Sequence, residues 1–283
     1  RNQGVEVALS TRNVHTKNFM WTTNFNFAYN NNKVLKEALR EDALEPGREG
    51  YPAGALFALK TAGLDEEGYP MFQDKDGKAV SAMEFFKLQE WGFGATDLTA
   101  RERRELYTYV GTADCPYTGG FNNTFTYKAF ELGVNFSFDF GGKVRSQPTY
   151  SIVDFDKGRN TNRDILNRWT PENTETIFPV LLSQNERLDE YMWYSNQNEI
   201  YRNLDIWIRD LNYVRLQNIR LGYTLPTNFS RTLGMTSATV AIEGRNLLVF
   251  GSSYKNYLDP ETMSNAYATP APKSVTLSLN LIF

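Results

Sequence analysis

The nine residues Val275-Thr276-Leu277-Ser278-Leu279-Asn280-Leu281-Ile282-Phe283 decide the fold class of this chain. Apolar side chains occupy every odd position, polar side chains occupy positions 276, 278 and 280, and the last residue is aromatic. Alternation with period two predicts a strand with one apolar and one polar face. Such a strand is typical of a transmembrane β-barrel, where one face meets lipid and the other a wet lumen. A soluble β-sandwich also contains such strands, so the rest of the sequence has to distinguish the two.

Six further segments repeat this alternation. The clearest is 131–140, where five consecutive apolar positions share one face and Glu131 and Asp139 lie at the ends of the other. In 211–225 the phase of the alternation slips, which predicts a β-bulge near Gln217 and Asn218. The seven predicted strands are therefore 5–10, 21–30, 121–128, 131–140, 211–225, 238–245 and 275–283.

The connections between these strands alternate strictly between short and long. The short ones are 12–18, a tight turn at Ala129 and 226–236, and the long ones are 31–116, 143–210 and 251–271. Outer-membrane barrels sort their connections in this way, with short periplasmic turns and long extracellular loops. Seven strands do not close a bacterial barrel, which needs an even number of at least eight, and an open edge in lipid leaves backbone groups unpaired. The sequence therefore predicts an all-β chain that forms the C-terminal strands of a larger antiparallel barrel.

Composition excludes several classes of protein. The net charge of −3 gives no electrostatic basis for binding nucleic acid. No stretch approaches the roughly 18 to 20 apolar residues of a membrane-spanning helix. The 19 Phe, 16 Tyr and 5 Trp suit the aromatic girdles of a barrel and sugar-stacking surfaces equally well.

The single cysteine and single histidine limit the possible chemistry. Cys115 alone forms no disulfide framework, and His15 alone forms no histidine pair. We interpret Cys115 as a structural thiol. The opening residues, Arg1-Asn2-Gln3-Gly4, have none of the features of a signal peptide, so an exported protein with this sequence is a processed chain or a fragment.

Several sequence blocks resemble one family in the order in which that family carries them. The strand Leu211–Pro226 (LNYVRLQNIRLGYTLP) resembles the "fLRLkNisLGYtLP" strand of SusC-like (RagA-like) TonB-dependent transporters of the Bacteroidota. Further blocks that match this family are Trp21–Phe27 with Asn32–Val34, Gly54–Lys60, Ala62–Gly68, Gly119–Lys128, Asn167–Thr170, Gly244–Leu248 and Tyr254–Glu261. The resemblance spans nearly the whole chain, although the family's signal peptide, plug domain and TonB box have no counterpart in it.

The resemblance implies a transporter of the outer membrane and not an enzyme. Members of this family form 22-stranded barrels that pair with a SusD-like surface lipoprotein acting as a lid. They import oligosaccharides or peptides with energy that TonB relays through the plug, and commonly form a dimer of such pairs. The resemblance implies that the long loops 31–116, 143–210 and 251–271 face the lipoprotein and the substrate.

One long loop is rich in aromatic residues. Tyr191, Trp193, Tyr194, Tyr201 and Trp207 are interleaved with amides and carboxylates, a combination that suits sugar rings. We predict substrate contacts for Trp193, Tyr194 and Tyr201. The alternative is that these side chains pack the loop onto itself or against the lid.

Charged residues on the polar faces of the predicted strands are the second set of candidates. Glu131, Asp139, Glu243 and Arg245 point into the lumen if the apolar faces meet lipid. There they tune selectivity or hold the plug by ion pairing, and plug contact is the favoured interpretation. We expect Phe283 to be the terminal residue that serves barrel assembly.

Other motifs have simpler structural explanations. Asp65-Glu66-Glu67-Gly68 and Asp74-Lys75-Asp76-Gly77 are similar to calcium loops but lack the spacing of an EF-hand, so we interpret them as two turns around a short strand at 69–72. Capping-box spacing at Ser81–Glu84 predicts a short helix, and 160–169 can hold another. We find no nucleophile–base pair, phosphate loop or metal triad, and expect neither catalysis, a metal nor a cofactor.

Two rival interpretations remain. A soluble or cell-surface carbohydrate-binding β-protein would bury the same apolar faces against each other, and would not need detergent. A siderophore or vitamin receptor outside the SusC-like group would share the barrel, but the blocks at 119–125 and 215–223 point away from it.

Overall fold

The computed structural model describes residues 1–146, 158–160, 163–181, 189, 202–251, 259–262 and 268–283. Seven long strands form one antiparallel sheet in the order β1-β2-β8-β9-β10-β11-β12, so the all-β prediction is confirmed. Their bounds are Asn2–His15 (β1), Phe19–Asn32 (β2), Tyr117–Tyr127 (β8), Phe130–Arg145 (β9), Ile208–Thr224 (β10), Ser237–Phe250 (β11) and Ser274–Ile282 (β12). Within the described ranges, no helix is both long and apolar enough to span a membrane.

All seven predicted strands are present, and most of them are longer than the alternation indicated. The first runs over 14 residues instead of six, because polar residues such as Asn2, Gln3 and Arg12 continue its pairing with β2. The turn between β1 and β2 is correspondingly tighter than predicted. Hydrophobic alternation thus locates a strand but underestimates its length where a polar sequence continues the backbone ladder.

The predicted β-bulge in β10 is confirmed. The register shifts between Leu216 and Asn218 against both neighbouring strands, β9 and β11. Gln217 is therefore the extra residue opposite β9, and the shift restores the apolar phase for Ile219 and Leu221. Two further register shifts in the long sheet, between Arg12 and Val14 and between Leu211 and Tyr213, were not predicted.

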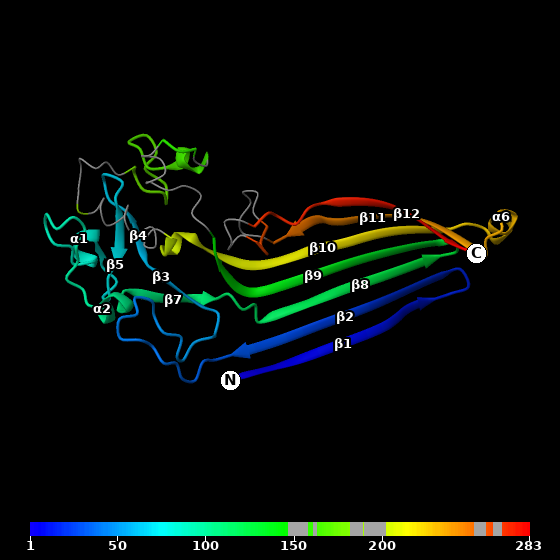
Figure 1. Cartoon of the computed structure of the whole chain (residues 1–283), viewed down its shortest axis with the longest axis horizontal. Helices are drawn as coiled ribbons and strands as arrows, with labels where there is room; N and C mark the ends of the chain where they lie inside the picture. Colours follow the sequence, from blue (N-terminus) through cyan, green and yellow to red (C-terminus); the bar gives the residue numbers. More distant parts are fainter. Residues whose placement is uncertain (147–157, 161–162, 182–188, 190–201, 252–258, 263–267) are drawn as a thin grey trace.

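Short and long connections lie at opposite ends of the sheet (Figure 1). The short helix α6 (Thr227–Thr232) and the C-terminus lie at one end, together with the β1–β2 and β8–β9 turns. The elements inserted between β2 and β8 lie at the other end. The sorting of connections by length in the sequence therefore corresponds to a sorting in space.

The long connections carry their own small elements. These are β3 (Ala55–Leu59), β4 (Thr61–Leu64), β5 (Pro70–Gln73), β6 (Ala79–Val80), α1 (Ala82–Phe85), α2 (Ala100–Glu105), β7 (Tyr107–Thr112) and the 3-10 helices η1 (Arg163–Asn167) and η2 (Asp205–Trp207). β3 pairs with β7, and β4, β5 and β6 form a second small sheet.

The main hydrophobic core lies in these connections and not in the long sheet. Two different connections contribute to it, since Leu204 and Trp207 pack with residues of 59–88. Phe72 stacks on Phe85 with ring centroids 4.8 Å apart. We call this folded unit the cap. Its buried core residues are Leu59, Tyr69, Phe72, Val80, Ala82, Phe85, Phe86, Leu88, Leu204 and Trp207.

Local hydrogen bonds confirm the interpretation of the acidic motifs as turns. Asp65 Oδ1 accepts from the amides of Glu67 and Tyr69, and Asp74 Oδ1 accepts in the same way from Asp76 and Lys78. Both carboxylates thus shape the turns on either side of β5. The predicted helix start at Ser81 is also confirmed, since its hydroxyl accepts from the Glu84 amide.

Candidate functional site

The register of the long sheet sorts its side chains onto two faces of opposite character. Residues that pair across strands lie on the same face, and one cross-strand row runs Leu9, Phe25, Phe121, Phe136 and Leu216. The adjacent row runs Ser10, Asn24, Asn122, Asn135, Asn218 and Arg245. Apolar and polar rows therefore stay in phase across the seven strands.

The apolar face is exposed over much of its area. We define it by Val5, Val7, Leu9, Phe25, Phe27, Phe121, Phe125, Leu132, Phe136, Phe138, Leu216, Ile219, Leu221, Val240, Ile242, Leu277 and Leu279. Leu277 is 76% exposed and Val5 is 61% exposed. An apolar surface of this extent on a folded protein marks a partner or a lipid environment.

The polar side chains that fall on the apolar face are bonded to one another. The side-chain oxygen Oδ1 of Asn123 accepts from Trp21 Nε1 at 2.9 Å and from the Thr23 hydroxyl at 2.8 Å. Thr23 and Asn123 are both buried. Internal pairing of this kind is what a hydrocarbon environment requires, because lipid offers no hydrogen-bond partner.

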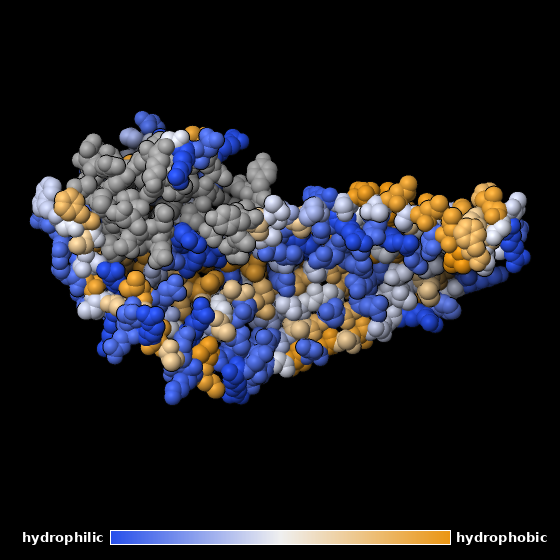
Figure 2. Space-filling model, viewed as in Figure 1, coloured by the Kyte–Doolittle hydropathy of each residue, from blue (hydrophilic) through white to orange (hydrophobic). Residues whose placement is uncertain are grey.

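The polar face carries the charged residues that the sequence analysis singled out. We define it by Glu6, Ser10, Asn24, Asn26, Asn122, Glu131, Asn135, Ser137, Asp139, Arg215, Asn218, Arg220, Glu243, Arg245, Ser278 and Asn280. Figure 2 shows hydrophilic side chains along the middle of the long sheet and hydrophobic ones toward its margins. The structure thus brings Glu131, Asp139, Glu243 and Arg245 onto one surface.

Three of these four candidates form side-chain hydrogen bonds on the polar face, in two separate groups. Glu131 forms an ion pair with Arg220 at 3.2 Å. Glu243 Oε1 accepts from Arg245 Nε at 2.7 Å and from the side-chain amide of Asn218 at 3.3 Å. The charges are therefore held in place along the strands.

Asp139, the fourth candidate, belongs to a separate cluster that the sequence analysis missed. Its carboxylate accepts a 2.5 Å hydrogen bond from the Tyr213 hydroxyl, which also lies 3.1 Å from Glu261 Oε1. Arg215 donates from Nε to Glu261 at 2.8 Å and forms an ion pair with Asp259. Asp259 and Glu261 belong to the block at 254–261 that carries the family resemblance. That block was the one sign in the sequence that these two carboxylates belong to a functional cluster.

Burial and charge act in opposite directions on Asp259. Burial alone raises the pKa of this carboxyl group, but the Arg215 guanidinium and the amides of Glu261 and Ala271 outweigh it. The net effect is a lowered pKa. Asp259 is therefore an anion near neutral pH, as its ion pair with Arg215 requires.

Of the aromatic residues predicted in the long loop 143–210, the structure describes Trp207. Trp193, Tyr194 and Tyr201 lie outside the described residues, so their contact with substrate stays a prediction. Trp207 is 1% exposed and packs in the core of the cap. For Trp207 the packing alternative is therefore correct.

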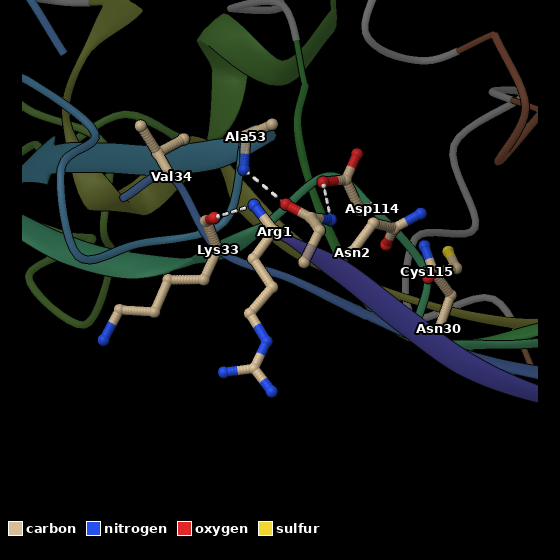
Figure 3. A pocket seen from close by; sticks show the side chains of 9 residues that line it. Arg1, Asn2, Asn30, Lys33, Val34, Ala53, Asp114 and Cys115 are labelled. Atoms are coloured by element: carbon tan, nitrogen blue, oxygen red, sulfur yellow. Dashed lines mark hydrogen bonds between the residues drawn. The ribbon is translucent and has the colours of Figure 1, made fainter. Parts of the chain in front are cut away.

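A recess of about 520 Å³ lies where β1 and β2 meet the two ends of the connection between β2 and β8 (Figure 3). Among the described residues that line it, Asp114 is the one acidic group, and it accepts from the Asn32 side-chain amide at 2.9 Å and the Gly54 amide at 3.0 Å. The side-chain oxygen of Asn32 in turn accepts from the Ala53 backbone amide at 2.6 Å. The recess is lined by Arg1, Asn2, Asn30, Asn32, Lys33, Val34, Ala53, Asp114 and Cys115.

The polar groups of the recess hold neighbouring segments of the chain together and are not arranged for a reaction. Burial, together with nearby carboxylates, raises the pKa of the Cys115 thiol to about 11, which keeps it protonated and poorly nucleophilic at neutral pH. In the part of the chain that the structure describes, no three His, Cys, Asp or Glu residues are grouped so as to hold a metal ion.

Comparison with known proteins matches the chain over its whole length. It is 26% identical over 310 residues to TonB-dependent receptor P3 of Formosa agariphila, covering 100% of this chain and 28% of that protein. It is 22% identical to TonB-dependent receptor SusC of Bacteroides thetaiotaomicron, covering 99% of this chain and 26% of the relative. No family model matches.

Solved structures show the same fold. The structure of the RagAB peptide transporter superposes with a TM-score of 0.71 and 23% identity, over 99% of this chain and 29% of that chain. The same importer in an open-open state gives a TM-score of 0.70. The resemblance to SusC-like TonB-dependent receptors that the sequence blocks indicated is confirmed, and the chain spans a little over a quarter of the length of these relatives.

Proposed function

We propose that this chain forms the C-terminal strands of an outer-membrane barrel that imports nutrients with energy from TonB. The observation that carries the proposal is the pair of opposite faces on one seven-stranded sheet with its long connections at one end. The resemblance to TonB-dependent receptors supports it over the whole chain.

The apolar face then meets lipid. The rows from Val5 and Tyr29 to Val240 and Leu279 contain no Asp, Glu, Lys or Arg among the described strand residues, and the charged pair Lys143–Asp210 lies on this side only farther toward the long connections. One Arg or Lys on this face at the bilayer midplane would cost about 2–4 kcal/mol. The apolar rows therefore satisfy the strictest chemical requirement of a lipid-facing surface.

The polar face then lines the lumen. Glu131, Asp139, Glu243 and Arg245 offer fixed charges there, and contact with a plug is the role we assign to them. Additional strands must complete the barrel, because both edge strands, β1 and β12, have an unpaired side in this sheet.

The cap and the neighbouring connections then lie outside the cell. We infer that they contact a SusD-like surface lipoprotein and the incoming substrate, as two such pairs in a dimer. The substrate is an oligosaccharide or a peptide. The likeness to a peptide transporter favours peptides, and the aromatic loop favours glycans.

The test is purification of the native protein from the source membrane. We expect the chain to need detergent for extraction and to copurify with plug-bearing barrel sequence and a lipoprotein, which mass spectrometry would identify together with any bound glycan or peptide. A species near 32 kDa that is soluble without detergent and free of partners would overturn the proposal. That result would support the carbohydrate-binding surface protein instead.

A further inference from the structure

A buried arginine on the polar face holds part of a long connection. Arg215 is only 2% exposed although it points to the hydrophilic side of β10. Its cover includes residues 259–261, which follow β11 along the chain and supply both of its carboxylate partners. A polar face that was simply open to water would leave this side chain solvated.

The arginine is paired on both sides of its guanidinium. Nε donates to Glu261 at 2.8 Å and a terminal nitrogen pairs with Asp259. Tyr213 lies two positions before Arg215 in the same strand; its hydroxyl donates to Asp139 of β9 at 2.5 Å and lies 3.1 Å from Glu261 Oε1. The segment is thus tied to two adjacent strands of the sheet.

Asp259 also organises the segment internally. One of its carboxylate oxygens accepts from the Glu261 amide at 3.0 Å, and the other accepts from the Ala271 amide at 3.2 Å. Positions 259 and 271 are therefore held together, close to where β12 begins. A single carboxylate joins the two ends of this stretch to the arginine of the sheet.

We propose that Arg215 is a positioning residue that latches residues 259–262 against the polar face, as a fixed part of the wall of the passage at its long-connection end. The existence of a passage rests on the proposed function. The latch itself does not, because it is defined by contacts within the chain. Within the loop 251–271, which we expect to face the lipoprotein and the substrate, residues 259–262 lie against the polar face.

The experiment measures how accessible this segment is in the full-length transporter in detergent. A reporter cysteine replaces Thr262 in a Cys115→Ser background with any other reactive cysteine removed, and its modification by a polyethylene-glycol maleimide is followed by gel shift. We expect Arg215→Gln to raise the modification rate by roughly tenfold or more, because the segment then opens locally. Arg215→Lys keeps the charge without the two-sided fork and should give an intermediate rate.

Arg220→Gln is the matched control. Arg220 lies on the same face of the same strand, but it pairs with Glu131 and forms no hydrogen bond or ion pair with the described residues 259–262. Its modification rate should stay within about twofold of the parent. Equal rates in the Arg215→Gln and Arg220→Gln proteins would overturn the latch.

A second variant keeps the test decisive if Arg215→Gln does not fold. Glu261→Gln removes one partner whose side chain is 42% exposed, and should raise the rate while thermal denaturation stays near that of the parent. An unchanged rate in this folded variant would also overturn the latch. Failure of the proposed function would be seen separately, as a chain that does not partition with membranes.

Discussion

At the scale of single residues, neighbouring positions in β8 should tolerate charge very differently. Phe121 lies on the apolar face and Asn122 on the polar face. We expect Phe121→Arg to destabilise the full-length barrel in lipid vesicles by about 2–4 kcal/mol, because the charge enters hydrocarbon. Asn122→Arg should cost much less.

The measurement is denaturant-induced unfolding of both variants in vesicles of one composition. Equal losses for the two substitutions would contradict a lipid-facing role for the apolar face. The comparison is sharp because the two residues are adjacent and lie on opposite faces of one strand.

The latch predicts a dependence on acid pH through Asp259. The pKa of this carboxyl is lower in the folded protein, so its contribution to stability is present above its unfolded pKa of about 3.9. It is lost as the pH falls through the folded value. Arg215 stays charged throughout, and the other groups facing Asp259 in this cluster are Glu261, Tyr213 and Asp139.

Thermal denaturation of the parent and of Asp259→Asn should therefore differ at pH 7 and converge below pH about 4. Asp42→Asn is the control, because the Arg40–Asp42 pair is exposed and contributes little at any pH. A difference between the parent and Asp259→Asn that persists unchanged to pH of about 2 would show that the lowered pKa is not the cause.

At the scale of elements, the capping box of α2 should determine whether that helix forms. The Thr99 hydroxyl accepts from the Glu102 amide at 3.2 Å, and the Glu102 carboxylate accepts from the Thr99 amide at 2.9 Å. These bonds, with Lys87, lower the pKa of Glu102 to about 2. Thr99→Ala should cost the helix about 1 kcal/mol.

Amide exchange across 100–106 would test this, with exposed Thr108→Ala in β7 as the control. Faster exchange confined to the Thr99→Ala protein is the expected result. Similar exchange in both variants would mean that packing against neighbouring residues holds α2 without the Thr99 hydroxyl.

Local patterns predicted some elements well and missed others for definite physical reasons. The slip of hydrophobic phase at Gln217 predicted a bulge because side chains in a strand must keep to their face. The Asp65 and Asp74 turns were predictable because a carboxylate two residues before an amide closes them. The Arg215 cluster was not predictable from pattern, since its partners lie 44 and 46 residues away and only the folded chain joins them.

At the scale of the whole molecule, the described part of the long sheet has no second layer. Both of its faces carry exposed side chains and both of its edge strands lack one partner. We therefore expect the chain, produced by itself in water, to aggregate in a β-rich form. Sedimentation and infrared spectroscopy of the isolated chain would check this.

A monodisperse soluble monomer in that experiment would contradict the barrel and support the soluble alternative. Addition of detergent should reduce the aggregation, because it covers the apolar face. Denaturant alone should suppress aggregation only while the chain is unfolded.

The two parts of the molecule obey opposite rules of substitution. In the cap, large apolar residues such as Phe72 and Trp207 are inside, so a polar replacement is damaging at buried sites. In the sheet, Leu277 and Val5 are outside, and a polar replacement is damaging where exposure is greatest. A substitution score trained on water-soluble proteins will thus rank variants correctly in the cap and in reverse order on the apolar face of the sheet.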